Sequence, residues 1–203
     1  MSAEPGPVRL TGDRVLLRDW TPDDRERVTW LLDAARPWHA TNGPYFGAPS
    51  AAETSAQIRR FHALGEADPQ ELPVPRTMLG IEHAGVLVGA VSWYWESRET
   101  DWRRMGIGIH DEAYWGRGLA TEALALWTSY LFRTTDALRL DFATYSGNPA
   151  MIAVGRKLQF VCEGRFRKAR RWSGGVHDSV VFGLLREEWL EVSRTWPGPR
   201  PTG

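Results

Sequence analysis

A short glycine-containing turn, placed directly before a helical pattern, constrains this chain more than any other feature. The segment from Tyr114 to Ala123 reads YWGRGLATEA, so two glycines flank Arg117 before apolar residues recur at helical spacing. Glycine has no Cβ, which lets the backbone approach a bound group closely. Amide N–H groups in the first turn of a helix are free to bind an anion. The turn therefore predicts a diphosphate-type site between a strand and a helix.

Two common nucleotide-binding motifs do not fit this turn. A Rossmann fingerprint follows the first strand and needs a third glycine, whereas here the preceding strand is a late one and Ala120 with Thr121 continue the run. A Walker loop needs Gly-Lys-Ser/Thr, which the turn lacks. The diphosphate must therefore belong to another class of ligand.

Composition narrows the classes of protein further. The 203 residues include 25 basic and 25 acidic side chains, and this balance argues against a dedicated nucleic-acid or anionic-membrane binder. The single cysteine, Cys162, allows no intrachain disulfide and indicates a reducing compartment, so we expect a cytoplasmic location. The N-terminus lacks a signal-peptide pattern, and no apolar run approaches the roughly 20 residues of a membrane helix.

Hydrophobic periodicity predicts one α/β domain over residues 9–190, with residues 1–8 and 191–203 as flexible tails. Thr21 and Ser50 are the expected N-caps of two early helices, and Gly65 is the expected stop of the second. Two more helices are expected, one after the glycine turn and one at 148–158. Strands are expected at 14–19, 76–82, 86–95, 103–110, 138–145, 160–172 and 176–185.

This order of elements resembles the GNAT superfamily of acetyl-CoA-dependent N-acetyltransferases, in the branch of ribosomal-protein N-terminal and spermidine acetyltransferases. The resemblance is densest over 106–120 and 148–164. Trp115, Gly118 and Ala120 match the three defined places of the family's phosphate loop, although Trp115 replaces the usual Gln or Arg. The resemblance implies an α/β (α+β) fold, with a mixed, mostly antiparallel sheet splayed between two parallel strands and helices on both faces.

The same resemblance implies acetyl-CoA as co-substrate and no metal. Its pantetheine would bind the edge of strand 103–110, which would explain Gly106 and Gly108 as close-approach glycines. Asn148 would bond pantetheine, cap its own helix, or do both. The cofactor-binding residues expected on this basis are Ile107, Ile109, His110, Trp115, Gly116, Arg117, Gly118, Leu119, Ala120 and Asn148.

The implied reaction is direct attack of a primary amine on the acetyl thioester within a ternary complex. The acceptor would be a protein N-terminus or a small molecule, no membrane partner is expected, and a homodimer is left open. Three positions that carry proton-transfer groups in relatives lack them here. The family's glutamate matches Met105, its tyrosine matches Gly155, and its serine matches Met151.

Replacement groups for proton transfer are open. Tyr145 and Ser146, at the end of a strand, are the catalytic candidates, with Glu96, Glu99 and His110 as further options. A water chain is another alternative. The missing groups also leave open a non-catalytic acyl-CoA-binding module.

A basic run covers 165–171, where five of seven residues are Arg or Lys. The simplest interpretation is a hairpin edge that charge protects from pairing. Two functional alternatives are an acceptor site for carboxylate-bearing partners and, less consistent with the balanced charge, a nucleic-acid surface.

Overall fold

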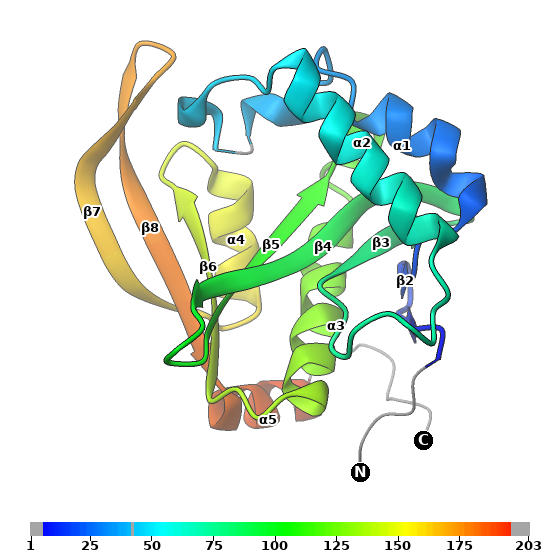
Figure 1. Ribbon diagram of the computed structural model, residues 1–203. Coiled ribbons are helices and arrows are strands. Elements are labelled where there is room, and N and C mark those ends of the chain that lie inside the picture. Colours follow the sequence, from blue (N-terminus) through cyan, green and yellow to red (C-terminus); the bar gives the residue numbers. More distant parts are fainter. Residues whose placement is uncertain (1–5, 42, 196–203) are drawn as a thin grey trace.

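The computed structural model describes residues 6–41 and 43–195, whose eight strands form one sheet in the order β1-β2-β3-β4-β5-β6-β8-β7 (Figure 1). Every neighbouring pair is antiparallel except β5 and β6, which are parallel, so the predicted mixed sheet is confirmed. The strands are β1 Arg9–Thr11, β2 Leu16–Arg18, β3 Met78–His83, β4 Val86–Ser97, β5 Trp102–Ile109, β6 Arg139–Tyr145, β7 Val161–Trp172 and β8 Gly175–Leu185.

Helices cover both faces of the sheet. Figure 1 shows α1 and α2 over β3 and β4 on one face, while α3 crosses the other face with α4 beside it and α5 at its lower end. The helices are α1 Arg25–Leu31, α2 Ala51–Glu66, α3 Leu119–Thr134, α4 Pro149–Lys157 and α5 Arg186–Thr195. Short 3-10 turns, η1 Pro22–Asp24, η2 Pro37–Ala40, η3 Pro44–Phe46 and η4 Glu112–Tyr114, lie between the longer elements.

Two apolar cores result from the alternation of side chains along the strands. The larger core lies under α3, where Trp127 is fully buried beside Val91 of β4 and Phe142 of β6. The smaller core lies under α1 and α2 and includes Ala90 of β4 with Trp38. Successive residues of β4 therefore stabilise opposite layers.

The parallel strands β5 and β6 separate after a single paired position. Within the described residues their pairing consists of the single register pair Arg104↔Asp141. The Asp141 carboxylate is fully buried there and accepts from Arg104 Nε at 2.8 Å and from Trp102 Nε1 at 2.5 Å. Figure 1 shows the two strands diverging toward their C-terminal ends. The charged contact therefore lies where the two strands begin to separate.

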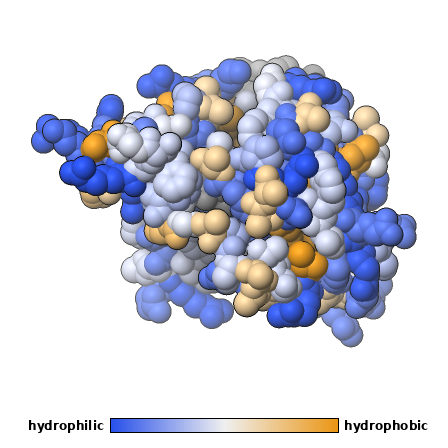
Figure 2. Space-filling view, turned by 90° about the horizontal axis from the view of Figure 1, so that it is seen from above, coloured by the Kyte–Doolittle hydropathy of each residue, from blue (hydrophilic) through white to orange (hydrophobic). Residues whose placement is uncertain are grey.

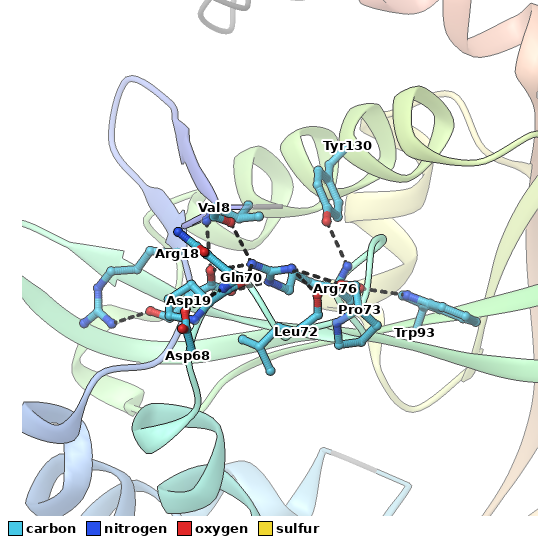
Figure 3. Close-up of polar contacts among 12 residues, drawn as sticks. Val8, Arg18, Asp19, Asp68, Gln70, Leu72, Pro73, Arg76, Trp93 and Tyr130 are labelled. Carbon is cyan, nitrogen blue, oxygen red and sulfur yellow. Dashed lines mark hydrogen bonds and ion pairs between the residues drawn. The ribbon is translucent and has the colours of Figure 1, made fainter. Parts of the chain in front are cut away.

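The buried side chain of Arg76 joins several segments on the β2–β3 side of the sheet (Figure 3). Its guanidinium donates to Asp19 from Nε at 2.8 Å and from Nη2 at 3.2 Å. Its backbone N–H donates to the hydroxyl of Tyr130 on α3 at 2.8 Å. Further guanidinium bonds reach the carbonyl oxygens of Gly6, Pro69, Leu72 and Pro73. Full pairing is what a buried charge requires.

Several sequence-based boundaries were wrong. Strand β1 was not predicted, and helix α2 continues through Gly65 to Glu66. A Cβ on Gly65 would lie 2.7 Å from the carbonyl oxygen of Thr21, so this glycine allows close packing and does not stop the helix. The segment 36–49, for which no helix or strand was predicted, contains η2 and η3.

The expected tails also need correction. Helix α5 spans 186–195, and Trp189 with Val192 is buried in the larger core, so 191–195 is not a loose tail. At the other end, the Gly6 carbonyl accepts from Arg76 and the Val8 N–H donates to Asp19 at 2.8 Å. The rest of both expected tails, 1–5 and 196–203, lies outside the described residues.

Candidate functional site

The glycine turn forms an open arrangement of backbone donors. Gly116 and Gly118 have φ values of 73° and 78°, in the left-handed region that favours glycine, and α3 begins directly after Gly118. The N–H groups of residues 116–118 donate to no described residue, and no side chain caps the helix. A Cβ on Gly116 would meet nothing within 4 Å. The turn and the first turn of α3 can therefore accept an anion.

Arg14, a residue that no sequence motif singles out, lies against this turn. Its Nη1 donates to the carbonyl oxygen of Arg117 at 2.8 Å, and its Nε lies 3.0 Å from Oε2 of Glu122. Glu122 is buried in the first turn of α3 and also accepts from the Arg14 backbone N–H at 2.8 Å. Arg14 thus balances a carboxylate that would otherwise repel an anion from the turn.

The register of β5 directs alternate amides toward the gap before β6. His110 N–H donates to the Val88 carbonyl at 2.8 Å, and Gly108 and Gly106 are the next even-numbered partners of β4. In an antiparallel ladder the intervening residues face their backbone groups the other way. The N–H groups of Ile107 and Ile109 therefore point toward the side where β6 separates.

The two predicted close-approach glycines of β5 have another explanation. A Cβ on Gly106 would lie 2.7 Å from Ser92 Oγ, and one on Gly108 would lie 2.6 Å from His110 Nε2. Both glycines thus make room for neighbouring side chains on the face opposite α3.

Trp115 and His110 pack at the C-terminal end of β5. The Trp115 indole donates from Nε1 to the Ile109 carbonyl at 2.8 Å while its ring stays partly exposed. The His110 ring lies 4.3 Å from that of Trp38, which stacks on His39 at 3.8 Å. Burial, together with the nearby His39, lowers the pKa of His110 to about 4, so its imidazole is neutral at pH 7.

The end of β6 brings Tyr145, Ser146 and Asn148 together. Asn148 caps α4 by accepting from the Met151 N–H at 3.0 Å, as predicted, and its Nδ2 donates to the Thr41 carbonyl at 3.3 Å. Ser146 Oγ accepts from the Asp178 N–H at 2.9 Å. The buried Tyr145 has no hydrogen-bond partner for its hydroxyl among the described residues, and burial raises its pKa.

The three positions that lack proton-transfer groups are packing positions. A Cβ on Gly155 would lie 2.7 Å from Cζ of Phe142, so an aromatic ring of the core fills this space. Met105 is buried in the larger core, and Met151 packs against its edge. Larger or polar side chains at these places would need a different core.

The other candidate acids and Arg165 of the basic run have local partners. Glu96 pairs with Arg104 at 2.8 Å, and Glu99 accepts from Ser97 Oγ at 3.2 Å. In the β7–β8 hairpin, Arg165 pairs with Asp178 at 2.6 Å. Figure 2 shows this hairpin as a largely hydrophilic projection at the left.

Residues 6–41 and 43–195 contain no group of three or more His, Cys, Asp or Glu side chains able to hold a metal ion. Within the same ranges, every helix is too short or too polar to cross a membrane.

Comparisons with known proteins agree with this architecture. Among solved structures, a GNAT-family acetyltransferase from Bacillus anthracis has a TM-score of 0.68 at 18% identity, covering 89% of this chain and 100% of its own. RimL, a ribosomal-protein alpha-N-acetyltransferase in complex with coenzyme A, has a TM-score of 0.65 at 20% identity, covering 88% and 97%. At these identities the likeness shows the fold.

Curated relatives match shorter stretches. YokL of Bacillus subtilis, an uncharacterised prophage-derived N-acetyltransferase, is 32% identical over 78 residues, which is 38% of this chain and 44% of YokL. YdaF of the same organism, named as a candidate ribosomal N-acetyltransferase, is 28% identical over 110 residues, 54% of this chain and 60% of YdaF. The matched part thus spans about half the length of each relative. A family model for the GNAT acetyltransferase domain matches residues 14–161, so the chain belongs to the GNAT acetyltransferase family.

Proposed function

We propose that this protein transfers an acetyl group from acetyl-CoA to a primary amine, either a protein N-terminus or a small molecule. The observation that carries the proposal is the glycine turn, with free amides at 116–118 and Arg14 beside it at the start of α3. Besides a diphosphate site, an acyl-CoA needs hydrogen-bond donors for its pantetheine. The N–H groups of Ile107 and Ile109 on the free edge of β5 supply these donors in the proposal. RimL, which shares the fold, is in complex with coenzyme A.

The expected cofactor residues divide into two groups in this proposal. The diphosphate group is Trp115, Gly116, Arg117, Gly118, Leu119 and Ala120, to which we add Arg14. The other group lines the gap between β5 and β6 and consists of Ile107, Ile109, His110 and Asn148. Acetyl-CoA, when bound, supplies an activated acyl group, while the protein positions it and offers N–H donors to a developing oxyanion.

Tyr145 is the stronger of the two catalytic candidates in this proposal. Its raised pKa keeps a proton on Oη at neutral pH, and that hydroxyl is free of protein partners in the described part of the chain. Ser146 Oγ is already used in fixing the Asp178 backbone. The neutral imidazole of His110, on the same face of the sheet as Tyr145, can accept a proton through water, although its low pKa makes it a weak base.

A pair of matched variants tests the acetyl-CoA assignment. Gly118→Asp places a carboxylate in the turn, and Arg14 Nη1 lies 3.0 Å from the new Cβ position, so the new carboxylate also competes with a bound anion for the Arg14 guanidinium. Gly118→Asn has the same shape without the charge, and Asn tolerates the left-handed conformation. Calorimetry is expected to show no acetyl-CoA binding for the Gly118→Asp variant and measurable binding for the Gly118→Asn variant. Wild-type affinity in the Asp variant would refute the assignment.

Amine turnover separates the enzyme from a non-catalytic module. Release of CoA with at least one of a panel of small amines and N-terminal peptides is expected for the wild type. Intact acetyl-CoA binding without turnover of any amine would instead identify an acyl-CoA-binding module.

A further inference from the structure

Four side chains from three distant segments meet at the C-terminal end of β6. The ring of Tyr45, in η3, lies 5.4 Å from that of Tyr145, which lies 5.4 Å from the His177 ring on β8. The Arg170 guanidinium on β7 lies 4.3 Å above the Tyr45 ring, and Arg170 pairs with His177 in the hairpin register. We call these four residues the hairpin cluster. Gly147 lies beneath it, because a Cβ there would collide with both Tyr145 and His177.

Arg170 is a cation without an anion in this cluster. Its Nε is buried and has no hydrogen-bond partner among the described residues, and no ion pair in that part of the chain includes it. The Arg170 guanidinium lies over the rings of Tyr45 and Phe46, with its Cζ 4.3 and 5.4 Å from the two ring centroids. By contrast, Arg165 on the same strand is paired with Asp178. Stacking fixes the guanidinium plane. Neither Nη atom of Arg170 has a hydrogen-bond partner among the described residues, so this end of the group is free for a ligand.

The hairpin cluster lies on the same face of the sheet as Gly106 and Gly108 of β5. Phe142 points into the core under α3, so Ala143 and Tyr145 of β6 point to the opposite face, and Ala143 is exposed there. Gly106 and Gly108 present no side chains on that face of β5. Tyr145, and with it the cluster that includes Arg170, therefore lies on the same face of the sheet as this part of β5.

We propose that the hairpin cluster is an acceptor subsite that binds a carboxylate of the amine substrate, with Arg170 as its charged partner. The proposal rests on the proposed amine acetylation and names the chemistry of its acceptor. An Arg fork held flat by an aromatic ring matches a planar carboxylate in a bidentate manner. The carboxylate has two sources, the α-carboxylate of a free amino acid and an acidic side chain near a peptide N-terminus.

Product binding tests the subsite without requiring turnover. Calorimetry with and without CoA would compare N-acetylglycine with N-acetylglycinamide, and N-acetyl-Ala-Glu-amide with N-acetyl-Ala-Gln-amide. We expect at least one acid to bind about tenfold more tightly than its neutral partner. Preference in the first pair assigns a free amino acid, and preference in the second assigns an acidic peptide.

Variants at neighbouring positions of β7 complete the test. Arg170→Gln should remove the acid preference, Arg170→Lys should retain part of it, and Arg171→Gln, at an exposed position on the same strand, should leave it unchanged. The proposal is overturned if neither pair discriminates, if Arg170→Gln weakens acid and amide equally, or if Arg170→Gln instead removes salt-sensitive oligonucleotide binding. If the wild type does not bind acetyl-CoA, this result counts against the proposed function alone. The titration without CoA still tests the role of Arg170.

Discussion

The Nε of Arg14 lies 3.0 Å from Oε2 of Glu122, an ion pair between residues 108 positions apart in sequence that borders the glycine turn. Glu122 is buried, whereas the Arg14 side chain is 52% exposed. The pair therefore has one fixed member and one that solvent or a ligand can reach. Through Nη1, Arg14 also donates to the carbonyl oxygen of Arg117 in the glycine turn.

Replacing Arg14 should weaken acetyl-CoA binding. Arg14→Ala leaves the Glu122 carboxylate unbalanced beside the turn, so an approaching diphosphate meets repulsion. We expect a loss of affinity of about three- to tenfold, measured by calorimetry at low salt, because a half-exposed charge is screened. Arg60→Ala, at an exposed position on α2, is the control. Equal affinity of the Arg14 variant and the wild type would show that Arg14 has no part in the site.

Removal of the Arg76 guanidinium should destabilise the fold. Arg76→Met leaves buried Asp19 without its partner and frees four backbone carbonyls, those of Gly6, Pro69, Leu72 and Pro73. Breaking a buried ion pair from one side costs about 3–5 kcal/mol. Urea unfolding should show this loss, while Arg60→Met should not. A change under about 1 kcal/mol, the size typical of a surface pair, would contradict the account.

Local signals in the sequence predicted the features whose causes are local. The Ser50–Glu53 capping box is present, with each side chain bonded to the other's backbone. The Asn148 cap is also confirmed, since one side chain suffices for it. The strands expected at 160–172 and 176–185 are joined by a turn in which Ser173 and Gly174 have left-handed φ values. The glycine turn was found for the same reason.

Features that depend on distant partners escaped prediction. Gly65 is the residue type that often ends a helix, but its role here is set by the backbone of Thr21, which is distant in sequence. Arg14 belongs to the site because α3 brings Glu122 to it. The hairpin cluster likewise needs η3, β6 and β7–β8 to meet. Nothing in the sequence around any one of these residues shows its partner.

His110 should make stability fall in mild acid. Its pKa is about 4 in the folded protein, below the ordinary value of 6.5, because the ring is buried against Trp38 and near His39. As pH decreases from 6.5 to 4, the unfolded chain therefore takes up a proton that the folded protein does not. The unfolding free energy should drop by about 2–3 kcal/mol more than in His110→Gln. Parallel pH profiles for the two proteins would contradict the lowered pKa.

Asp141 should control both stability and the opening between β5 and β6. Its buried carboxylate accepts from Trp102 at 2.5 Å and from Arg104 at 2.8 Å, and Arg139 lies 3.4 Å away. Asp141→Asn keeps the shape but removes the charge, which leaves the largely buried Arg104 with Glu96 as its remaining acidic partner. We expect a loss of about 2–4 kcal/mol in urea unfolding. Asp136→Asn, at an exposed position after α3, should change stability little.

Hydrogen exchange distinguishes a local from a global role for Asp141. The Arg104↔Asp141 pair is the single register point that joins β5 to β6 in the described structure, so its weakening should first open the parallel junction. Amides of β6 near residue 141 should then exchange faster than those of β3 and β4, whose antiparallel ladder is continuous apart from one bulge. Uniform acceleration across the sheet would show that Asp141 contributes to global stability without setting the point where the strands separate.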